Sequence, residues 1–123
     1  MSVQNLESTT EHLLRVAVNL PKNEFEIFVS HARRLKKREE GLLAKLETFD
    51  LSNEEQAVYR KLLRKFRAEK ITPEEHQQLI ELTEKLEGLN VERLKCLVEV
   101  AKIRRKTLPE VMQELNIKPK NYA

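Results

Sequence analysis

The segment from Thr72 to Arg105 constrains the fold most, because an apolar stripe runs along it at the period of an α-helix. It opens with Thr72-Pro73-Glu74-Glu75, which combines a hydroxyl N-cap, a proline at the first helical position and a glutamate at the third. A helix over this segment would be roughly 50 Å long at about 1.5 Å per residue. We expect one continuous helix, with a kink or short break at Gly88 and Asn90, two weak helix formers, as the alternative.

A helix this long is large for a small domain, so its apolar stripe must be covered by another subunit or a partner if the rest of the chain cannot cover it. The stripe is therefore a candidate self-association surface, consisting of Leu79, Leu82, Leu86, Leu94, Leu97 and Ala101. Acidic residues dominate the first half of the segment and basic residues crowd its end. This order complements the dipole of one continuous helix.

Further helix-start signals divide the remaining chain, each with a Glu three residues after a Ser, Thr or Asn. They are Ser8 with Glu11, Asn23 with Glu26, Ser52 with Glu55, and Thr107 with Glu110. Pro21 and Gly41 are expected to stop the first two helices. Residues 42–51 are either a short helix or an ordered connector. Asn116 is expected to stop the last helix, and Pro119 to mark the end of ordered chain.

Helical spacing also predicts the core-facing residues of the middle helices. The second helix presents Phe25, Phe28, Val29, Ala32 and Leu35, and the third presents Val58, Leu62 and Phe66 with Tyr59 and Leu63 beside them. No strand-like alternation occurs in the sequence. The prediction is an all-α bundle of four to five helices, with one long helix at about 73–105 and a short C-terminal helix.

The length of 123 residues fits one domain, which we expect to comprise N-terminal helices at 7–70 and the long and short helices at 71–119. One cysteine excludes an internal disulfide framework and suits a reducing compartment. The N-terminus lacks the pattern of a signal peptide, and no apolar run approaches the ~18 residues of a membrane span. A cytoplasmic protein without membrane contact is expected.

Nothing in the sequence is typical of catalysis. His12, His31 and His76 lie far apart without a second ligand at metal-binding spacing, so surface histidines are the simplest interpretation. Cys96 lies among aliphatic residues and is expected to be a partly buried structural thiol. Two glycines cannot form a phosphate-binding loop. We expect no enzyme activity, no metal and no cofactor.

Two clusters of cations form the candidate nucleic-acid or partner surface. They are Arg33, Arg34, Lys36, Lys37 and Arg38 in the second helix, and Arg60, Lys61, Arg64, Lys65 and Arg67 in the third. Such clusters can follow phosphates. The formal charge of the whole chain is only +3, and both helices also carry Glu, so a solvated helical face is the simpler interpretation of each cluster.

The motifs Ile71-Thr72-Pro73-Glu74-Glu75-His76, Asn90-Val91-Glu92-Arg93-Leu94 and Leu108-Pro109-Glu110-Val111-Met112 resemble a family of small helical proteins common in cyanobacteria and some other bacteria. Leu115-Asn116-Ile117 stands where that family has Leu-Gly-Ile. The N-terminal unit of two helices around Leu20-Pro21 is similar to short antitoxin segments that hold a partner protein. The resemblance implies an antitoxin-like partner of a small toxin or nuclease, and it brings no catalytic residues.

The leading functional expectation is thus a non-enzymatic protein-interaction module with a protein partner. A nucleic-acid-binding, autoregulatory protein that uses the basic faces is one alternative, and a structural adaptor subunit of a larger assembly is another. A homodimer is compatible with each of the three.

Overall fold

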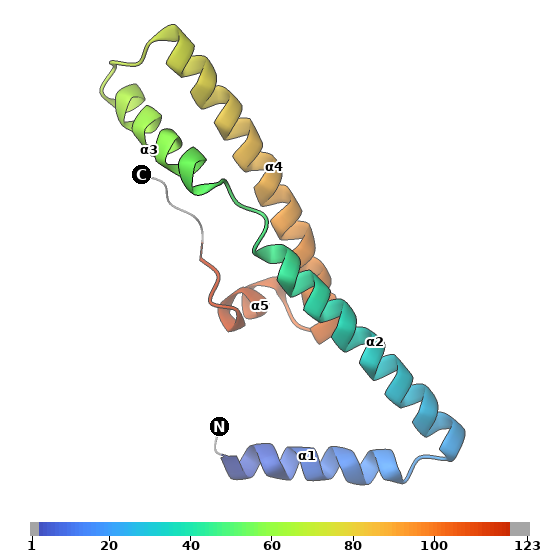
Figure 1. The fold of residues 1–123 in the computed structure, drawn as a ribbon. Helices are drawn as coiled ribbons and strands as arrows, with labels where there is room; N and C mark the ends of the chain where they lie inside the picture. Colours follow the sequence, from blue (N-terminus) through green and yellow to red (C-terminus); the bar gives the residue numbers. More distant parts are fainter. Residues whose placement is uncertain (1–2, 119–123) are drawn as a thin grey trace. The chain divides into compact units, whose positions relative to one another are not determined.

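The computed structural model describes residues 3–118, with side chains from Ser8 onwards, and within this range the chain forms five α-helices and no strand (Figure 1). They are α1 (Val3–Val18), α2 (Lys22–Leu46), α3 (Asn53–Arg67), α4 (Pro73–Arg104) and α5 (Leu108–Glu114). The predicted all-α class is confirmed. The expected end of order at Pro119 lies outside the described residues.

The chain divides into two compact units, residues 1–38 and residues 39–123, with the boundary inside α2. The sequence predicts a single domain, with N-terminal helices at 7–70 and the long and short helices at 71–119 as its parts. In the structure α3 and α4, on the two sides of residues 70 and 71, pack against each other. The C-terminal unit therefore contains the end of α2 together with α3, α4 and α5.

The predicted starts of α3, α4 and α5 are confirmed, and each has a complete capping box. At α4, the Glu75 N–H donates to Thr72 Oγ1 and the Thr72 N–H donates to Glu75 Oε1, both at 3.1 Å. The same reciprocal pair joins Ser52 to Glu55 at α3. As predicted, α4 is one continuous helix, and its 32 residues run through Gly88 and Asn90 without a break.

Three of the helices end on a non-glycine residue in the left-handed region: Glu69, Arg105 and Asn116, with φ of 57°, 54° and 55°. At each end the following residue donates its N–H to a carbonyl five residues earlier, as Lys70 does to Lys65 O at 2.9 Å. This is the Schellman arrangement, which satisfies carbonyls that the helix leaves without partners. The predicted stop at Asn116 is confirmed.

Two groups of buried side chains hold the C-terminal unit together. The first lies between α3 and α4 and contains Leu51, Tyr59, Leu62, Leu79 and Leu86. The second contains Leu97, Val100, Ala101 and Val111 where α4 meets α5, with Leu42, Leu43 and Leu46 of α2 packed against it. Burying one large aliphatic side chain contributes about 1.5–3 kcal/mol. Both groups draw on the apolar stripe of α4, so the chain itself covers most of that stripe.

Two predicted helix starts are wrong. α1 begins at Val3 rather than at Ser8, because no proline or glycine between them stops a helix, and a helical Ser8 cannot adopt the extended backbone of an N-cap. α2 begins at Lys22, so Asn23 lies inside the helix. The Phe25 N–H already donates to Pro21 O at 2.9 Å, which means that α2 starts as soon as the proline permits.

The predicted stop at Gly41 is also wrong, because α2 continues to Leu46. A glycine inside a helix costs about 1 kcal/mol relative to alanine. Packing of Leu42, Leu43 and Leu46 against the second core group outweighs this cost. Of the two alternatives for residues 42–51, the first half is therefore a continuation of α2 and the rest is a connector.

Candidate functional site

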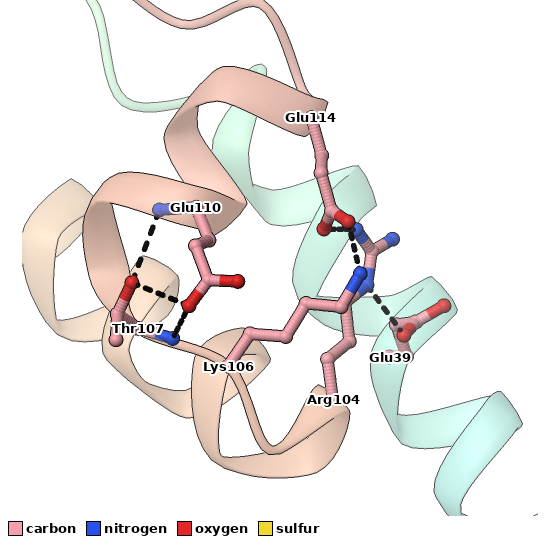
Figure 2. A network of polar contacts seen from close by, with 6 residues as sticks. All are labelled: Glu39, Arg104, Lys106, Thr107, Glu110 and Glu114. Atoms are coloured by element: carbon pink, nitrogen blue, oxygen red, sulfur yellow. Dashed lines mark hydrogen bonds and ion pairs between the residues drawn. The ribbon is translucent and has the colours of Figure 1, made fainter.

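The end of α4 carries a network of charges that joins three helices (Figure 2). Arg104 Nε donates to Glu39 Oε2 of α2 at 3.0 Å, and Arg104 Nη1 donates to Glu114 Oε1 of α5 at 3.1 Å. Lys106 also pairs with Glu114. Glu39 is only 7% exposed, so its carboxylate depends on the guanidinium for compensation. The network fixes the end of α2 to α4 and α5.

The same network shifts the pKa values of Arg104 and Glu114 toward their charged forms. Hydrogen bonding to Glu39, and then to Glu114, raises the pKa of Arg104. The Lys106 ammonium is the main cause that lowers the pKa of Glu114. Groups held ionised in this way stabilise the fold and do not exchange protons near neutral pH. The geometry is that of a structural junction.

Cys96 is a structural thiol, as predicted. Its side chain is buried, and its Sγ donates to Leu42 O at 3.1 Å. Burial raises the pKa of the thiol, and the nearby Lys45 only partly opposes this. A protonated thiol inside the core is a poor nucleophile.

The three histidines are divided between the two units, His12 and His31 in residues 1–38 and His76 in residues 39–123. His12 and His31 lie on α1 and α2, whereas His76 stacks on Phe66 with ring centroids 5.7 Å apart and an interplanar angle of 9°. Within residues 3–118, no group of three His, Cys, Asp or Glu side chains is arranged to hold a metal ion.

The two basic clusters lie in different units, the first in residues 1–38 and the second in residues 39–123. All cations of the first cluster are exposed. In the second, Arg60, Lys61, Arg64 and Arg67 are exposed, while Lys65 is partly covered and pairs with Glu75. That pairing is the main cause that lowers the pKa of Glu75 to about 2.

The candidate self-association stripe of α4 is mostly used inside the chain. Leu79, Leu86, Leu97 and Ala101 are buried, and Leu82 is partly buried against the first core group. Of the six residues, Leu94 alone is exposed, at 49%, next to the exposed Val91. Self-association through this stripe stays a prediction, but the need to cover it no longer supports it.

Most of the exposed large apolar side chains in the described residues lie elsewhere, in the N-terminal unit. No side chain described between Ser8 and Arg38 is buried. The exposed large apolar side chains there are Leu13, Leu14, Val16, Val18, Phe25, Ile27 and Phe28. On α2 they border an apolar groove formed by Leu20, Glu24, Ile27, Phe28, His31, Ala32 and Leu35. Helical periodicity assigns Phe28 and Leu35 to the apolar face of α2, and in the structure Phe28 is exposed and Leu35 is half-buried.

Phe66 differs from its expected position in the core. It is 50% exposed because α3 ends one residue later and the chain turns away. In the sequence Phe66 stands between Lys65 and Arg67, and this order is the signal that could have pointed to an aromatic side chain among the cations of α3.

Comparisons of the chain with profiles of known protein families, with curated proteins and with solved structures gave no match. Among residues 3–118, none of the helices has both the length and the apolar character needed to cross a membrane.

Proposed function

We propose that this protein is a non-enzymatic interaction module whose N-terminal unit binds a partner protein. The observation that carries this proposal is the contrast between the two units. Most large aliphatic side chains described in residues 39–118 are buried in, or packed against, two core groups, whereas between Ser8 and Arg38 none is buried and exposure reaches 72% at Val18. Exposed apolar surface of this kind marks interaction sites.

Energetics support the same conclusion. Most of the stability of a helix in a protein comes from packing of its apolar face, and no described side chain of α1 is buried. A partner that covers Leu13, Leu14 and Val16 would stabilise α1 and gain about 1.5–3 kcal/mol for each large side chain fully buried. The specific form of the proposal is antitoxin-like, with a small toxin or nuclease held by α1.

The test is co-expression with the product of the adjacent gene, scored by growth and by copurification. We expect the wild-type chain to restore growth and to copurify with that product, and Leu13→Asp/Leu14→Asp to lose both effects. Val91→Asp/Leu94→Asp is the matched control, since it places the same two charges on exposed apolar positions of α4. Absence of binding by the wild-type chain, or full activity of the α1 variant, would contradict the proposal.

A second candidate function, binding of single-stranded nucleic acid by α3, is favoured by a separate observation. Arg60, Lys61, Arg64 and Arg67 follow the spacing i, i+1, i+4, i+7 and therefore share the outward side of the helix. Each of the five cations of α4 has an oxygen partner. In the part of the chain that the structure describes, Lys61, Arg64 and Arg67 form no ion pair with a carboxylate.

The exposed ring of Phe66 lies in the last turn of α3, next to Arg67 in sequence, and projects from the side of the helix that carries Leu62. Proteins that bind single strands combine cations along a groove with aromatic rings on which bases stack. In this second proposal the cations of α3 contact phosphates, and Phe66, supported from behind by His76, stacks on one base.

Fluorescence anisotropy with labelled single-stranded and duplex oligonucleotides tests this candidate. Three or four phosphate contacts predict a loss of roughly 20- to 50-fold in single-strand affinity between 50 and 200 mM salt. Lys61→Glu/Arg64→Glu should abolish binding, and Phe66→Ala should weaken single-strand binding by about tenfold. Lys95→Glu/Lys102→Glu, with the same change in net charge on α4, is the control. Equal losses in both double variants would exclude a specific surface.

A further inference from the structure

One face of α2 is covered at its end and uncovered at its start. Leu42, Leu43 and Leu46 pack against the second core group of the C-terminal unit. Further toward the start of α2, the groove residues Leu35, Phe28 and Ile27 are not buried by the other described residues of the N-terminal unit, and Ile27 is 66% exposed. The first half of α2 therefore presents an exposed apolar face.

The sequence of this face is self-complementary. Glu24, Phe28, His31, Leu35 and Arg38 are spaced alternately by four and three residues, which is the spacing of a coiled-coil seam. The seam has a carboxylate at one end, a guanidinium at the other and His31 in the middle. Reversing the order places Glu24 opposite Arg38, Phe28 opposite Leu35, and His31 opposite itself.

We propose that the first half of α2 pairs antiparallel with the same segment of a second copy of this chain, about a two-fold axis at His31. A two-fold interface joins a surface patch to its own copy, so the patch must be complementary to itself when reversed. The charge order of α2 meets this condition, whereas a parallel pair would place Glu24 against Glu24 and Arg38 against Arg38. Ile27 and Ala32 then lie beside the seam and extend its apolar contact.

This inference deepens the proposed function by naming the occupant of the α2 groove, and it leaves α1 to the heterologous partner. Two helices of this length bury less than a standard interface, so a weak dimer is expected. Sedimentation equilibrium of the full chain, from about 1 to 100 µM, measures its dissociation constant. A chain that is monomeric over the whole range would overturn the inference.

Charge exchange across the seam tests the antiparallel order. Glu24→Arg and Arg38→Glu should each weaken the homodimer at least tenfold, because each puts like charges at both ends. The double variant Glu24→Arg/Arg38→Glu should restore dimerisation. A mixture of the two single variants should form a heterodimer, because both of its end pairs are then opposite in charge. Failure of both rescues would overturn the inference, even if the wild-type chain dimerises.

The residue at the axis gives an independent measurement. His31→Leu should tighten the dimer and His31→Lys should dissociate it, since two copies of the side chain meet there. Lys37→Leu and Arg33→Leu, on the opposite side of the helix, are controls that should leave the dissociation constant unchanged. Effects of equal size in the controls would contradict the assigned seam.

A chain that stays monomeric but still binds its partner through α1 would overturn only this inference, whereas a dimer that binds no partner would overturn only the proposed function.

Discussion

At the scale of single residues, the stability of the C-terminal unit depends on carboxylates that are paired. Glu39 has little access to water and is compensated by Arg104, whose guanidinium also reaches Glu114. Breaking such a pair costs more than replacing both partners, because the remaining charge stays buried. This asymmetry makes the pair measurable by a double-mutant cycle.

We predict that Arg104→Met lowers the free energy of unfolding by about 2 kcal/mol at neutral pH, because it leaves Glu39 without this counter-ion. The double variant Glu39→Met/Arg104→Met should recover most of that loss, since two apolar side chains of similar length then pack together. Urea denaturation followed by circular dichroism gives the values. Additive losses in the double variant would show that the two side chains are not coupled.

A second prediction at the residue scale concerns Glu75. Pairing with Lys65, assisted by the Thr72 N–H, lowers the pKa of Glu75 from its ordinary 4.5 to about 2. A carboxylate with a lowered pKa in the folded state stabilises the fold above its ordinary pKa and loses this contribution as the pH falls toward the folded value. The urea midpoint of the wild type should therefore exceed that of Glu75→Gln at neutral pH, and the two should converge as the pH approaches 2. Glu74→Gln, next to the capping box but outside it, is the control.

At the scale of helices, the sequence predicts a start only where the preceding residues cannot be helical. Thr72 begins α4 because Pro73 follows it and the left-handed Glu69 has already ended α3. Ser8 has the same pattern of hydroxyl and glutamate but no such break before it, so α1 starts earlier. A capping-box pattern in the sequence is thus not sufficient to predict a helix start.

Helical period also tells which face of a helix is apolar, but not what covers it. Leu79 and Leu97 were predicted for self-association, and the chain buries them itself. Phe28 was predicted for a core, and it is exposed. These residues all follow helical spacing within their stripes, yet Leu79 and Leu97 are buried and Phe28 is exposed. Burial is decided by long-range packing, which the spacing does not contain.

The two glycines of the chain provide the prediction at this scale. Gly41 and Gly88 lie inside helices, neither has a positive φ, and an added Cβ would meet nothing within 4 Å at either position. Gly88→Ala and Gly41→Ala should each raise the free energy of unfolding by about 1 kcal/mol. Thermal unfolding measures both. A loss of stability at Gly88 would indicate that α4 needs a bend there.

For the whole molecule, the positions of the buried residues tell more about how the chain divides into units than the length of the chain does. All buried side chains described lie between Glu39 and Val111, although α2 crosses the boundary as one helix. No change of composition marks residue 38, since basic and apolar residues continue on both sides of it. The boundary follows from which part of α2 finds neighbours, so it could not be predicted from the sequence.

If the core is confined to the C-terminal unit, removal of residues 1–33 should leave its cooperative unfolding intact and change its free energy by no more than about 0.5 kcal/mol. This truncation keeps one helical turn before Glu39, so the pair with Arg104 is retained. Removal of residues 107–123 is the matched control. It deletes the fully buried Val111 and the Glu114 partner of Arg104, and should cost at least about 3 kcal/mol. Both chains are compared with the wild type at a concentration below dimerisation. A large loss in the N-terminal truncation would mean that α1 and the first half of α2 stabilise the core, and their exposed apolar side chains would then no longer be free to bind a partner.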